Sequence, residues 1–501
     1  MLFVAVASGA GVLHALSFAP WNHPWLQIVA LALLFAMALR SGSWRESALL
    51  GFAFGLGWFG VGVSWVYISM HVYGLMPAPL AAGATAAFCA FLSLYPALAL
   101  SAAQIAVPAP LLRSTLGLPA AWCLSEWLRG TLLTGFPWLA AGYAHTDGPL
   151  AGFAPLVGVY GVTLIAALVA GALATLSLPI AVRGWRGYAW AAAIVAVSLA
   201  GGGLLGQLRW TVAAGSAISV KLVQANIPQE QKFTAEGLVR AFDAHWALMQ
   251  GPRADLVALP ESVFPVPLEL VPSEALEAFT RYSQDRRSAL IFGVFIVEPG
   301  DAYFNSAVGR APEDARWQRY SKQQLVPFGE FIPWGFRWFV DLMQMPIGDQ
   351  ERGGDDQVPM DLAGQRIAVN ICYEDLFGDV IRRAWHDPQR EPTIMLNLSN
   401  LAWFDDSIAL PQHLQISRMR ALETQHPMLR ATNTGATAVV DDRAVVTAQL
   451  PFATAAALDA RVQGMRGETP FLRFGNAPAV VVALLLGLAA ARAGRSLRKP
   501  S

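Results

Sequence analysis

The sequence predicts a multi-pass α-helical membrane domain with about eight transmembrane helices, joined to a layered α/β domain outside the bilayer. Charged residues make up 14% of the 501 residues, against roughly 25% in ordinary soluble domains, and the mean hydropathy is +0.43. Only nine Lys, Arg, Asp or Glu side chains occur before residue 188. From about Ser216 to Gly467 the pattern changes to short apolar strands separated by turns and helices. The net charge of zero is not the basic balance typical of nucleic-acid binding.

Apolar runs place the expected membrane helices, because a bilayer core of about 30 Å needs roughly 20 apolar residues per helix. About seven runs precede the α/β region and one follows it. The fifth run is interrupted by Glu126, Arg129 and Pro137. The expected helices are residues 2–18, 25–39, 48–68, 80–107, 118–139, 153–182, 188–205 and 477–491, in a membrane domain 1–210 and a C-terminal helix 475–492.

Basic residues orient these helices, since loops rich in Lys and Arg stay cytoplasmic. Arg40 with Arg45, then Arg113, then Arg183 with Arg186 follow helices two, four and six, and the tail 493–501 is basic. Both termini are therefore expected in the cytoplasm and the α/β domain, residues 216–467, on the outer side. The first run is alternatively a cleaved signal peptide, although it lacks a basic n-region.

The α/β region reads as near-continuous apolar strands alternating with helices, which favours a layered domain with buried sheets. We expect helices at residues 235–249, 273–286, 378–385 and 411–423. We expect strands at residues 220–224, 256–259, 290–297, 304–309, 318–322, 367–371, 393–398, 428–432 and 436–441.

Three of these strands end in a residue of catalytic type: Glu261, Lys322 and Cys372. A carboxylate can take the thiol proton and an ammonium can stabilise an oxyanion. Each residue alone is more often an ordinary surface or core residue, but together they favour a catalytic site at adjacent strand ends. Cys372 precedes a helix-like segment, so we expect the helix N-terminus to favour its thiolate. The other cysteines, Cys89 and Cys123, lie in apolar runs as packing residues.

Several segments carry a family resemblance. Residues 259–262 read Leu-Pro-Glu-Ser, residues 371–374 read Ile-Cys-Tyr-Glu, and residues 320–333 contain Lys322 and Glu330. Residues 396–400 and 418–423, with 62–69 and 133–138 in the membrane part, extend the match. This set resembles the nitrilase superfamily, and over nearly its full length the chain is similar to that superfamily's membrane-embedded branch, the apolipoprotein N-acyltransferases.

The resemblance implies an αββα sandwich for the α/β domain and a two-step acyl transfer. Cys372 would attack the sn-1 ester of a phospholipid, typically phosphatidylethanolamine, and form an acyl thioester. The N-terminal amine of a diacylglyceryl-cysteine on an apolipoprotein would then accept the chain. It also implies a protein of the bacterial inner membrane with its catalytic domain in the periplasm.

The resemblance assigns the residues as follows. Glu261 would be the general base, and Lys322 with the backbone N–H of Tyr373 would hold the oxyanion. Glu330 and Glu374 would support the site, and Tyr373 would line its wall. An aromatic and methionine-rich stretch is expected to form an interfacial lid or acyl surface, with an ordinary core segment as the alternative: Trp334, Phe336, Trp338, Phe339, Met343 and Met345, with Trp403 and Phe404.

Two departures from the family pattern affect local contacts. Phe233 stands where the family commonly has Trp, and residues 401–405 read Leu-Ala-Trp-Phe-Asp where Asp-Ala-Trp-Phe-Gly is usual. Glu126 and Arg129 are three apart on a helix, so we expect them to pair as architecture, with a headgroup contact as the alternative.

The eight histidines form no metal-ligand pattern, so no cofactor is expected. Nothing in the chain requires a partner subunit, and a monomer is expected. Two other functions stay open: a membrane-tethered amidase or nitrile hydrolase, and a binding module without catalysis.

Overall fold

The structure is a computed structural model that describes residues 1–229, 235–335, 337 and 349–497. Its chain divides into two compact units. The helical unit comprises Met1–Tyr67, Pro77–Leu208 and the chain from Arg473 onward. The sheet unit comprises Ile68–Met76 and Arg209–Leu472. A short segment from between two apolar helices therefore belongs with the sheet unit.

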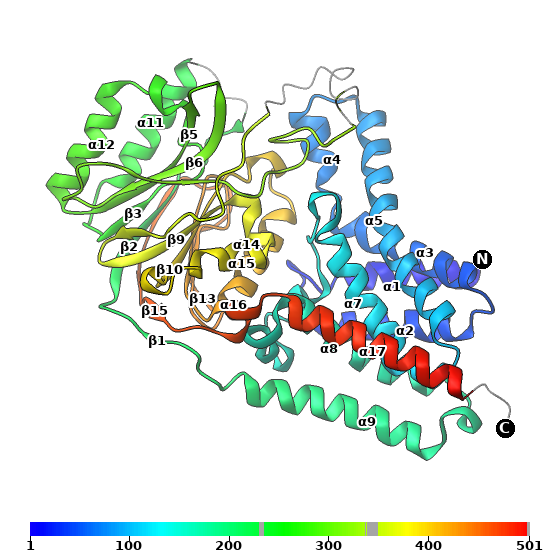
Figure 1. The fold of residues 1–501 in the computed structure, drawn as a ribbon. Helices are drawn as coiled ribbons and strands as arrows, with labels where there is room; N and C mark the ends of the chain where they lie inside the picture. Colours follow the sequence, from blue (N-terminus) through cyan, green and yellow to red (C-terminus); the bar gives the residue numbers. More distant parts are fainter. Residues whose placement is uncertain (230–234, 336, 338–348, 498–501) are drawn as a thin grey trace. The chain divides into compact units, whose positions relative to one another are not determined.

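All eight apolar runs of the sequence contain a helix (Figure 1). Four helices of the described chain are long and apolar enough to cross a bilayer: Ala78–Ala106, Pro149–Ser177, Gly184–Leu205 and Ala477–Ser496. The pair Trp44–Gly62 and Val66–Tyr73, bent by 63°, gives a fifth if it is one span. The helices are α1 (Leu2–Ala15), α2 (Pro24–Arg40), α3 (Trp44–Gly62), α4 (Val66–Ile68), α5 (Ala78–Ala106), α6 (Pro110–Leu112), α7 (Leu118–Arg129), α8 (Ala154–Ala174), α9 (Ile180–Leu205) and α17 (Ala477–Ser496).

The fifth apolar run differs from the expected helix over residues 118–139. Helical turns run without a break from Pro110, through a π-helical stretch Arg113–Gly117, to Arg129, and α7 ends there. Gly135 has φ +79°, and Pro137 follows, so the chain cannot continue as a helix. The segment that follows is held by side chains of α7 itself.

Helices α1 and α3 pack closely because glycine faces the neighbouring backbone on both sides. A Cβ on Gly11 would lie 1.9 Å from the carbonyl oxygen of Phe54, and one on Gly57 would lie 2.0 Å from that of Ser8. Such contacts between small residues are typical of helix pairs in membranes.

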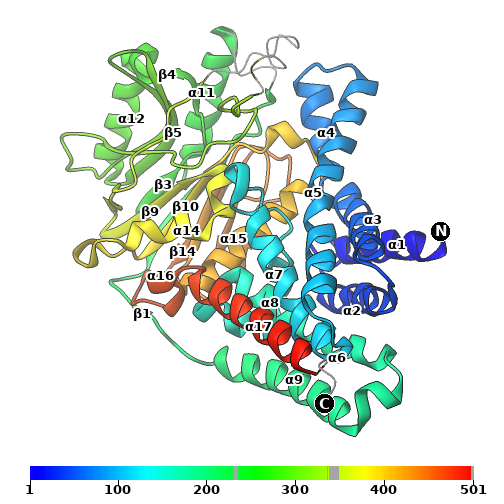
Figure 2. The same ribbon diagram turned by 45° about the vertical axis from the view of Figure 1, so that its right-hand side comes forward.

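The sheet unit is a sandwich of two mixed sheets covered by helices, best seen in Figure 2. One sheet has the order β14-β2-β3-β5-β6-β7, with β4 paired to β5, and the other has the order β13-β12-β11-β10-β9-β8. Strands β2, β3 and β5 are mutually parallel, as are β9, β10 and β11. The strands are β1 (Val212–Ala213), β2 (Ile218–Gln224), β3 (Leu256–Ala258), β4 (Phe264–Pro267), β5 (Ala289–Glu298), β6 (Ala302–Arg310), β7 (Gln318–Ser321), β8 (Met360–Leu362), β9 (Gln365–Ile371), β10 (Ile394–Ser399), β11 (Met428–Thr432), β12 (Ala438–Val440), β13 (Val446–Gln449), β14 (Ala456–Val462) and β15 (Met465–Arg466).

Three apolar cores explain the layers. The central core draws buried side chains from both sheets, including Leu222, Ile291, Ile367 and Leu396. A second core packs helices against the first sheet, and a third packs helices against the other. Each sheet is thus buried on both faces, which accounts for the near-continuous apolar strands. The helices are α11 (Ala235–Met249), α12 (Ser273–Arg286), α14 (Gly378–Ile381), α15 (Ala409–Thr424) and α16 (Pro470–Phe474).

The nine strand segments expected from the sequence all contain a strand, and the four expected helices of this region are present. Strands β1, β4, β8, β13, β14 and β15 were not predicted from the sequence. Strand β14 is half-exposed and pairs only with β2 in the seven-stranded sheet, and its Asp459 and Arg461 interrupt the apolar pattern.

Candidate active site

Cys372 lies directly after β9 and has φ +52°, in the left-handed region that residues with a Cβ rarely adopt. It begins a 3-10 turn, Cys372–Leu376, that leads into the four-residue helix α14. The carbonyl oxygen of Cys372 accepts hydrogen bonds from Asn397 Nδ2 at 3.2 Å and His413 Nε2 at 3.3 Å. The strained turn is therefore held by side chains of β10 and α15.

Glu261 follows β3, and both of its carboxylate oxygens are held. Asn305 Nδ2 donates to Oε1 at 2.8 Å and the backbone N–H of Asn400 donates to Oε2 at 2.8 Å. A Cβ on Gly293 of β5 would lie 2.6 Å from the Glu261 Cα, so only glycine lets the neighbouring strand approach this closely. The carboxylate is 6% exposed.

Lys322 follows β7 and is 1% exposed. Its Nζ lies 2.7 Å from Glu330 Oε1 and 3.6 Å from Glu261 Oε1. Burial lowers the pKa of Lys322, but Glu330 and Glu261 outweigh burial, so the pKa lies above its ordinary value. The ammonium stays charged at neutral pH and faces two carboxylates.

Glu330 holds this ammonium in place. Its Oε1 also accepts from Asn305 Nδ2 at 3.0 Å, and its Oε2 accepts from the backbone N–H of Val326 at 2.8 Å. Asn305 of β6 thus bridges both carboxylates, which the sequence reasoning did not identify. The only signal was a polar residue inside an apolar strand.

The structure brings Glu261, Lys322 and Cys372 together, but not at adjacent strand ends. Strands β3 and β7 belong to one sheet and are separated by β5 and β6, while β9 belongs to the other sheet. The strand ends meet because the sheets face one another in the sandwich. Electrostatic effects on Cys372 come from Glu261, Lys322 and Glu330.

The expectation of a resting thiolate is wrong. Burial raises the pKa of Cys372, Glu261 and Glu330 raise it further, and the lowering effects of Lys322 and the Asn400 N–H do not compensate. The following 3-10 turn has five residues and α14 has four, so little helix dipole acts on the sulfur. The site therefore holds a neutral thiol beside a carboxylate that can accept its proton.

Glu374 ties the cysteine turn to the lysine loop. Its carboxylate accepts from the backbone N–H of Ile371 at 2.6 Å and of Gln323 at 2.6 Å, and from Tyr320 Oη at 3.0 Å. Burial raises the pKa of Glu374 to about 7, against the lowering effect of the N–H donors at Ile371 and Gln323. Glu374 thus lies between the turn that begins at Cys372 and the loop that carries Lys322.

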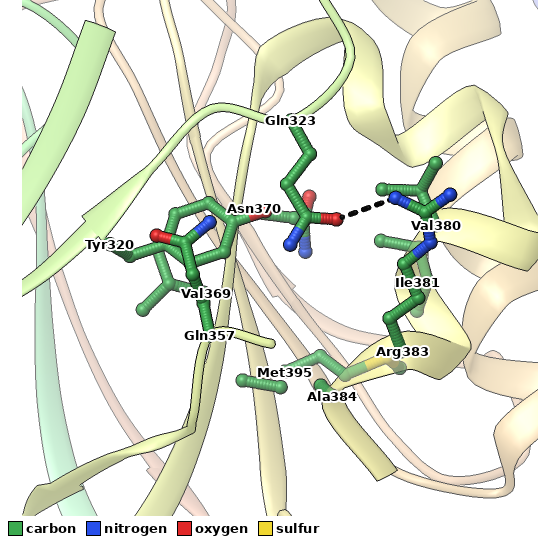
Figure 3. A pocket seen from close by; sticks show the side chains of 11 residues that line it. Tyr320, Gln323, Gln357, Val369, Asn370, Val380, Ile381, Arg383, Ala384 and Met395 are labelled. Atoms are coloured by element: carbon green, nitrogen blue, oxygen red, sulfur yellow. Dashed lines mark hydrogen bonds between the residues drawn. The ribbon is translucent and has the colours of Figure 1, made fainter. Parts of the chain in front are cut away.

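A cavity of about 20 Å³ lies beside this tie, with room for about one water. Tyr320, Gln323 and Asn370 line it together with Arg383, whose Nη1 donates to Gln323 Oε1 at 3.2 Å (Figure 3). Its size admits no acyl chain, so it is a packing gap behind the site rather than a substrate pocket.

The remaining predicted site residues lie in different settings. Tyr373 is 7% exposed and packs edge-on against Phe377, as a wall residue would. Trp334 is 99% exposed and Trp403 is 39% exposed. Trp403 contacts Tyr73 at 5.9 Å between ring centroids, so the segment Ile68–Met76 reaches the same surface. Phe404 is half-buried. Phe233, Phe336, Trp338, Phe339, Met343 and Met345 lie outside the described residues.

The departure at residues 401–405 has a structural consequence. Asp405 has φ +50° and ψ −159°, a conformation that glycine adopts readily and aspartate does not. Leu401 is 1% exposed and fills the sheet unit's interior. The loop thus keeps a glycine-like turn with a residue that has a Cβ.

In the helical unit, Glu126 and Arg129 form the expected pair at 3.4 Å and are almost fully buried. Arg129 Nη1 also donates to the carbonyl oxygens of Phe136 and Trp138, and the Ala141 N–H donates to Glu126. The pair thus holds the chain that follows α7, which is the structural role expected for it. Among the described residues no group of three or more His, Cys, Asp or Glu is arranged to hold a metal ion.

Comparison with known proteins covers both units. The family profile for the apolipoprotein N-acyltransferase N-terminal domain matches residues 10–172, and the carbon-nitrogen hydrolase profile matches residues 216–471. The chain is 50% identical to an apolipoprotein N-acyltransferase of Ralstonia nicotianae, over 97% of this chain and 92% of that protein. It is 43% identical to those of Bordetella bronchiseptica, over 99% and 98%, and Nitrosomonas europaea, over 98% and 97%. The second profile gives the sheet unit a carbon-nitrogen hydrolase fold.

Proposed function

Because this chain belongs to the apolipoprotein N-acyltransferase family, we propose that it transfers an acyl chain from a phospholipid, through Cys372, to the N-terminal amine of a lipoprotein. The observation that carries the proposal is the arrangement around Cys372 and the 3-10 turn that it begins. A neutral thiol on a strained turn shares one buried site with a carboxylate and an ammonium. That set can run acyl transfer without a cofactor.

In the first half-reaction Glu261 takes the proton from Cys372 as the sulfur attacks the sn-1 ester carbonyl of phosphatidylethanolamine. Lys322 and the backbone N–H of Tyr373 stabilise the oxyanion. The intermediate collapses, the carbon–oxygen bond breaks, and Glu261 returns the proton to the departing glycerol oxygen. A lysophospholipid leaves and an acyl thioester stays on Cys372.

In the second half-reaction the α-amino group of a diacylglyceryl-cysteine attacks the thioester. Glu261 accepts a proton from the amine, the carbon–sulfur bond breaks, and the thiolate is reprotonated. Splitting one ester-to-amide transfer into two steps lowers the barrier, because a thioester is a better acyl donor to an amine than an oxygen ester.

The contacts of the site suggest roles for the supporting residues. Glu330 fixes the Lys322 ammonium at 2.7 Å, and Glu374 fixes the turn that carries Cys372. Tyr373 is a wall of the acyl pocket, and Trp334, Trp403 and Phe404 belong to its lipid-facing surface. Exposed aromatic side chains suit the headgroup level of a bilayer.

The proposal also includes the placement of the chain. Residues 1–210 form the membrane domain, 216–467 the catalytic domain on the periplasmic side, 475–492 a C-terminal membrane helix and 493–501 a cytoplasmic tail. The chain spans the bacterial inner membrane about eight times and acts as a monomer. Four helices of the described chain are long and apolar enough to span a bilayer, a bent pair makes a fifth, and two shorter apolar helices and the basic loops add to the support for this arrangement.

Phospholipid labelling tests the chemistry. The purified full-length protein is incubated with phosphatidylethanolamine, and its intact mass is measured before and after hydroxylamine. The wild type and Cys89→Ala, a matched control, should gain an acyl adduct that hydroxylamine removes. Cys372→Ala should gain none. An unchanged mass in the wild type, with hydrolysis of small amides instead, would favour the amidase function.

A further inference from the structure

Cys372 keeps a backbone conformation that its own side chain does not favour, so neighbouring groups must hold it. Its carbonyl oxygen accepts from His413 Nε2 and Asn397 Nδ2. Neither side chain is part of the proposed chemistry. The carbonyl belongs to the peptide that follows the cysteine, so these bonds hold the backbone turn that carries the thiol.

The tautomer of His413 follows from its other neighbour. Arg430 Nη2 lies 2.6 Å from His413 Nδ1, and a guanidinium has only donors, so Nδ1 accepts. Burial and Arg430 hold the pKa of His413 well below its ordinary value, and the ring is neutral. Its one proton is therefore on Nε2, which donates to the Cys372 carbonyl oxygen.

Arg430 is itself held by the 3-10 turn that begins at Cys372. Its Nη1 donates to Asp375 Oδ2 at 2.8 Å and its Nε donates to the Ala436 carbonyl oxygen at 3.1 Å. Ser417 Oγ also bonds to both Asp375 and Arg430. Asp375 and Arg430 are fully buried, and His413 is 1% exposed.

The contacts close a ring, because Asp375 belongs to the same 3-10 turn that begins at Cys372. The turn is held at its first carbonyl by His413 and at its fourth residue by Arg430. We propose that Asp375, Arg430 and His413 form a positioning ring. The ring holds the strained backbone conformation of Cys372 and presents the Cys372 thiol to Glu261 and Lys322. These are positioning residues, since the hydrogen bonds that define the ring join them to one another and to the Cys372 carbonyl oxygen rather than to the thiol.

The inference rests on the proposed function only for its role in acyl transfer, so its test uses a reaction that needs no lipid. Iodoacetamide alkylates Cys372 at a rate that depends on the direction of the thiol and on its base. The rate is read by mass spectrometry of the Cys372 peptide from the full-length protein in detergent. Phosphatidylethanolamine labelling of the same samples is recorded separately.

Two variants of one residue separate hydrogen bonding from packing. His413→Leu removes both bonds, whereas His413→Gln keeps an acceptor for Arg430 and a donor for the carbonyl. We expect His413→Leu to slow alkylation at least tenfold and His413→Gln to stay within threefold of wild type. The matched control His426→Leu removes another fully buried histidine, which bonds to the Thr424 carbonyl, and should stay within twofold.

Wild-type or faster alkylation of a folded His413→Leu protein would overturn the ring, as would a His413→Gln variant as slow as His413→Leu. If His413→Leu shows no cooperative thermal transition, His413→Asn decides. This variant is polar but too short to bridge both partners, so alkylation should slow tenfold, and a wild-type rate overturns the proposal.

Acyl transfer gives a second readout. With phosphatidylethanolamine, His413→Leu should lower kcat at least tenfold and leave KM within twofold, because the ring orients the thiol and binds no lipid. A raised KM with unchanged kcat contradicts the ring. If the wild type forms no thioester at all, the proposed function fails, while the alkylation series still decides the ring.

Discussion

A buried group of opposite charges around Arg129 in the helical unit and one around Lys322 in the sheet unit are satisfied differently. In the helical unit Arg129 donates to two backbone carbonyl oxygens, lies 5.3 Å from the ring centroids of Trp58 and Phe59, and pairs with Glu126. In the sheet unit the Lys322 ammonium lies between the carboxylates of Glu330 and Glu261. The Arg129 guanidinium thus binds main-chain carbonyl oxygens, whereas the Lys322 ammonium contacts carboxylates.

This difference distinguishes buried charges with a structural role from the buried charges of the candidate site. Charges that bind backbone groups hold a loop, and their loss costs stability. Charges that pair with each other beside a titratable thiol are coupled to its protonation, because each of them changes the free energy of ionising that thiol. Buried ionisable residues alone thus do not mark an active site, whereas their partners do.

The largest expected effect is that of Lys322→Met. It leaves two buried carboxylates without their cation and removes the oxyanion donor, so thioester formation should fall about 10³-fold. The measurement is the initial rate of acyl adduct formation. Lys221→Met is the control, since Lys221 is 2% exposed but pairs with the half-exposed Asp459. If Lys322→Met forms the acyl adduct at a rate within tenfold of wild type, Lys322 is not part of the mechanism.

Arg129→Met tests the other side of the comparison. It leaves Glu126 buried without its cation, and breaking such a pair costs about 3 kcal/mol or more. The denaturation midpoint in detergent should fall, while activity per folded molecule stays within threefold. Arg186→Met, at an exposed arginine, should leave the midpoint unchanged. Loss of activity without loss of stability would place Arg129 in catalysis.

Glu374 is a carboxylate of the sheet unit that binds backbone N–H groups, so it sharpens the comparison. Its pKa of about 7 is raised above the model-peptide value, so the folded state binds the extra proton and stability is lost as pH rises through 7. The wild type should lose up to about 3 kcal/mol between pH 4.5 and 8 through this group.

Glu374→Gln lacks this ionisation, although it loses acceptor bonds at every pH. The stability gap between the wild type and Glu374→Gln should therefore narrow as pH rises. Unfolding midpoints at pH 5, 6, 7 and 8 provide the check. A gap that stays constant or widens would show that the carboxyl group is already ionised at low pH.

The smallest expected effect is that of Glu330→Gln. An amide can still contact Lys322, but the cation is then shared with one carboxylate only, so the rate should fall about 30-fold, or about 2 kcal/mol. Glu298→Gln, at the partly exposed partner of Arg319, is the control. A loss as large as that of Lys322→Met would make Glu330 part of the chemistry rather than a support.

Elements that produce a local pattern could be predicted accurately from the sequence. Strand β9 is an apolar run bounded by turn residues, and α15 has helical spacing between two loops, so their ranges differed from the structure by a few residues at most. Strand β14 has no such pattern, because a half-exposed strand mixes polar and apolar residues. The helix expected at residues 118–139 begins as predicted but ends at Arg129, whose side chain bonds to carbonyl oxygens of Phe136 and Trp138 in the irregular chain that follows.

The sequence alone determined the residue types of the candidate site and their order along the chain: Glu261, Lys322, Glu330, Cys372 and Glu374, each next to a strand or its loop. Only the tertiary structure decided which side chains meet and what surrounds them. Asn305 bridges carboxylates 44 and 25 residues away. Burial by both sheets makes Cys372 a thiol, although its local sequence favours a thiolate. Local sequence sets residue type and backbone preference, while a pKa depends on distant charges and on the exclusion of water.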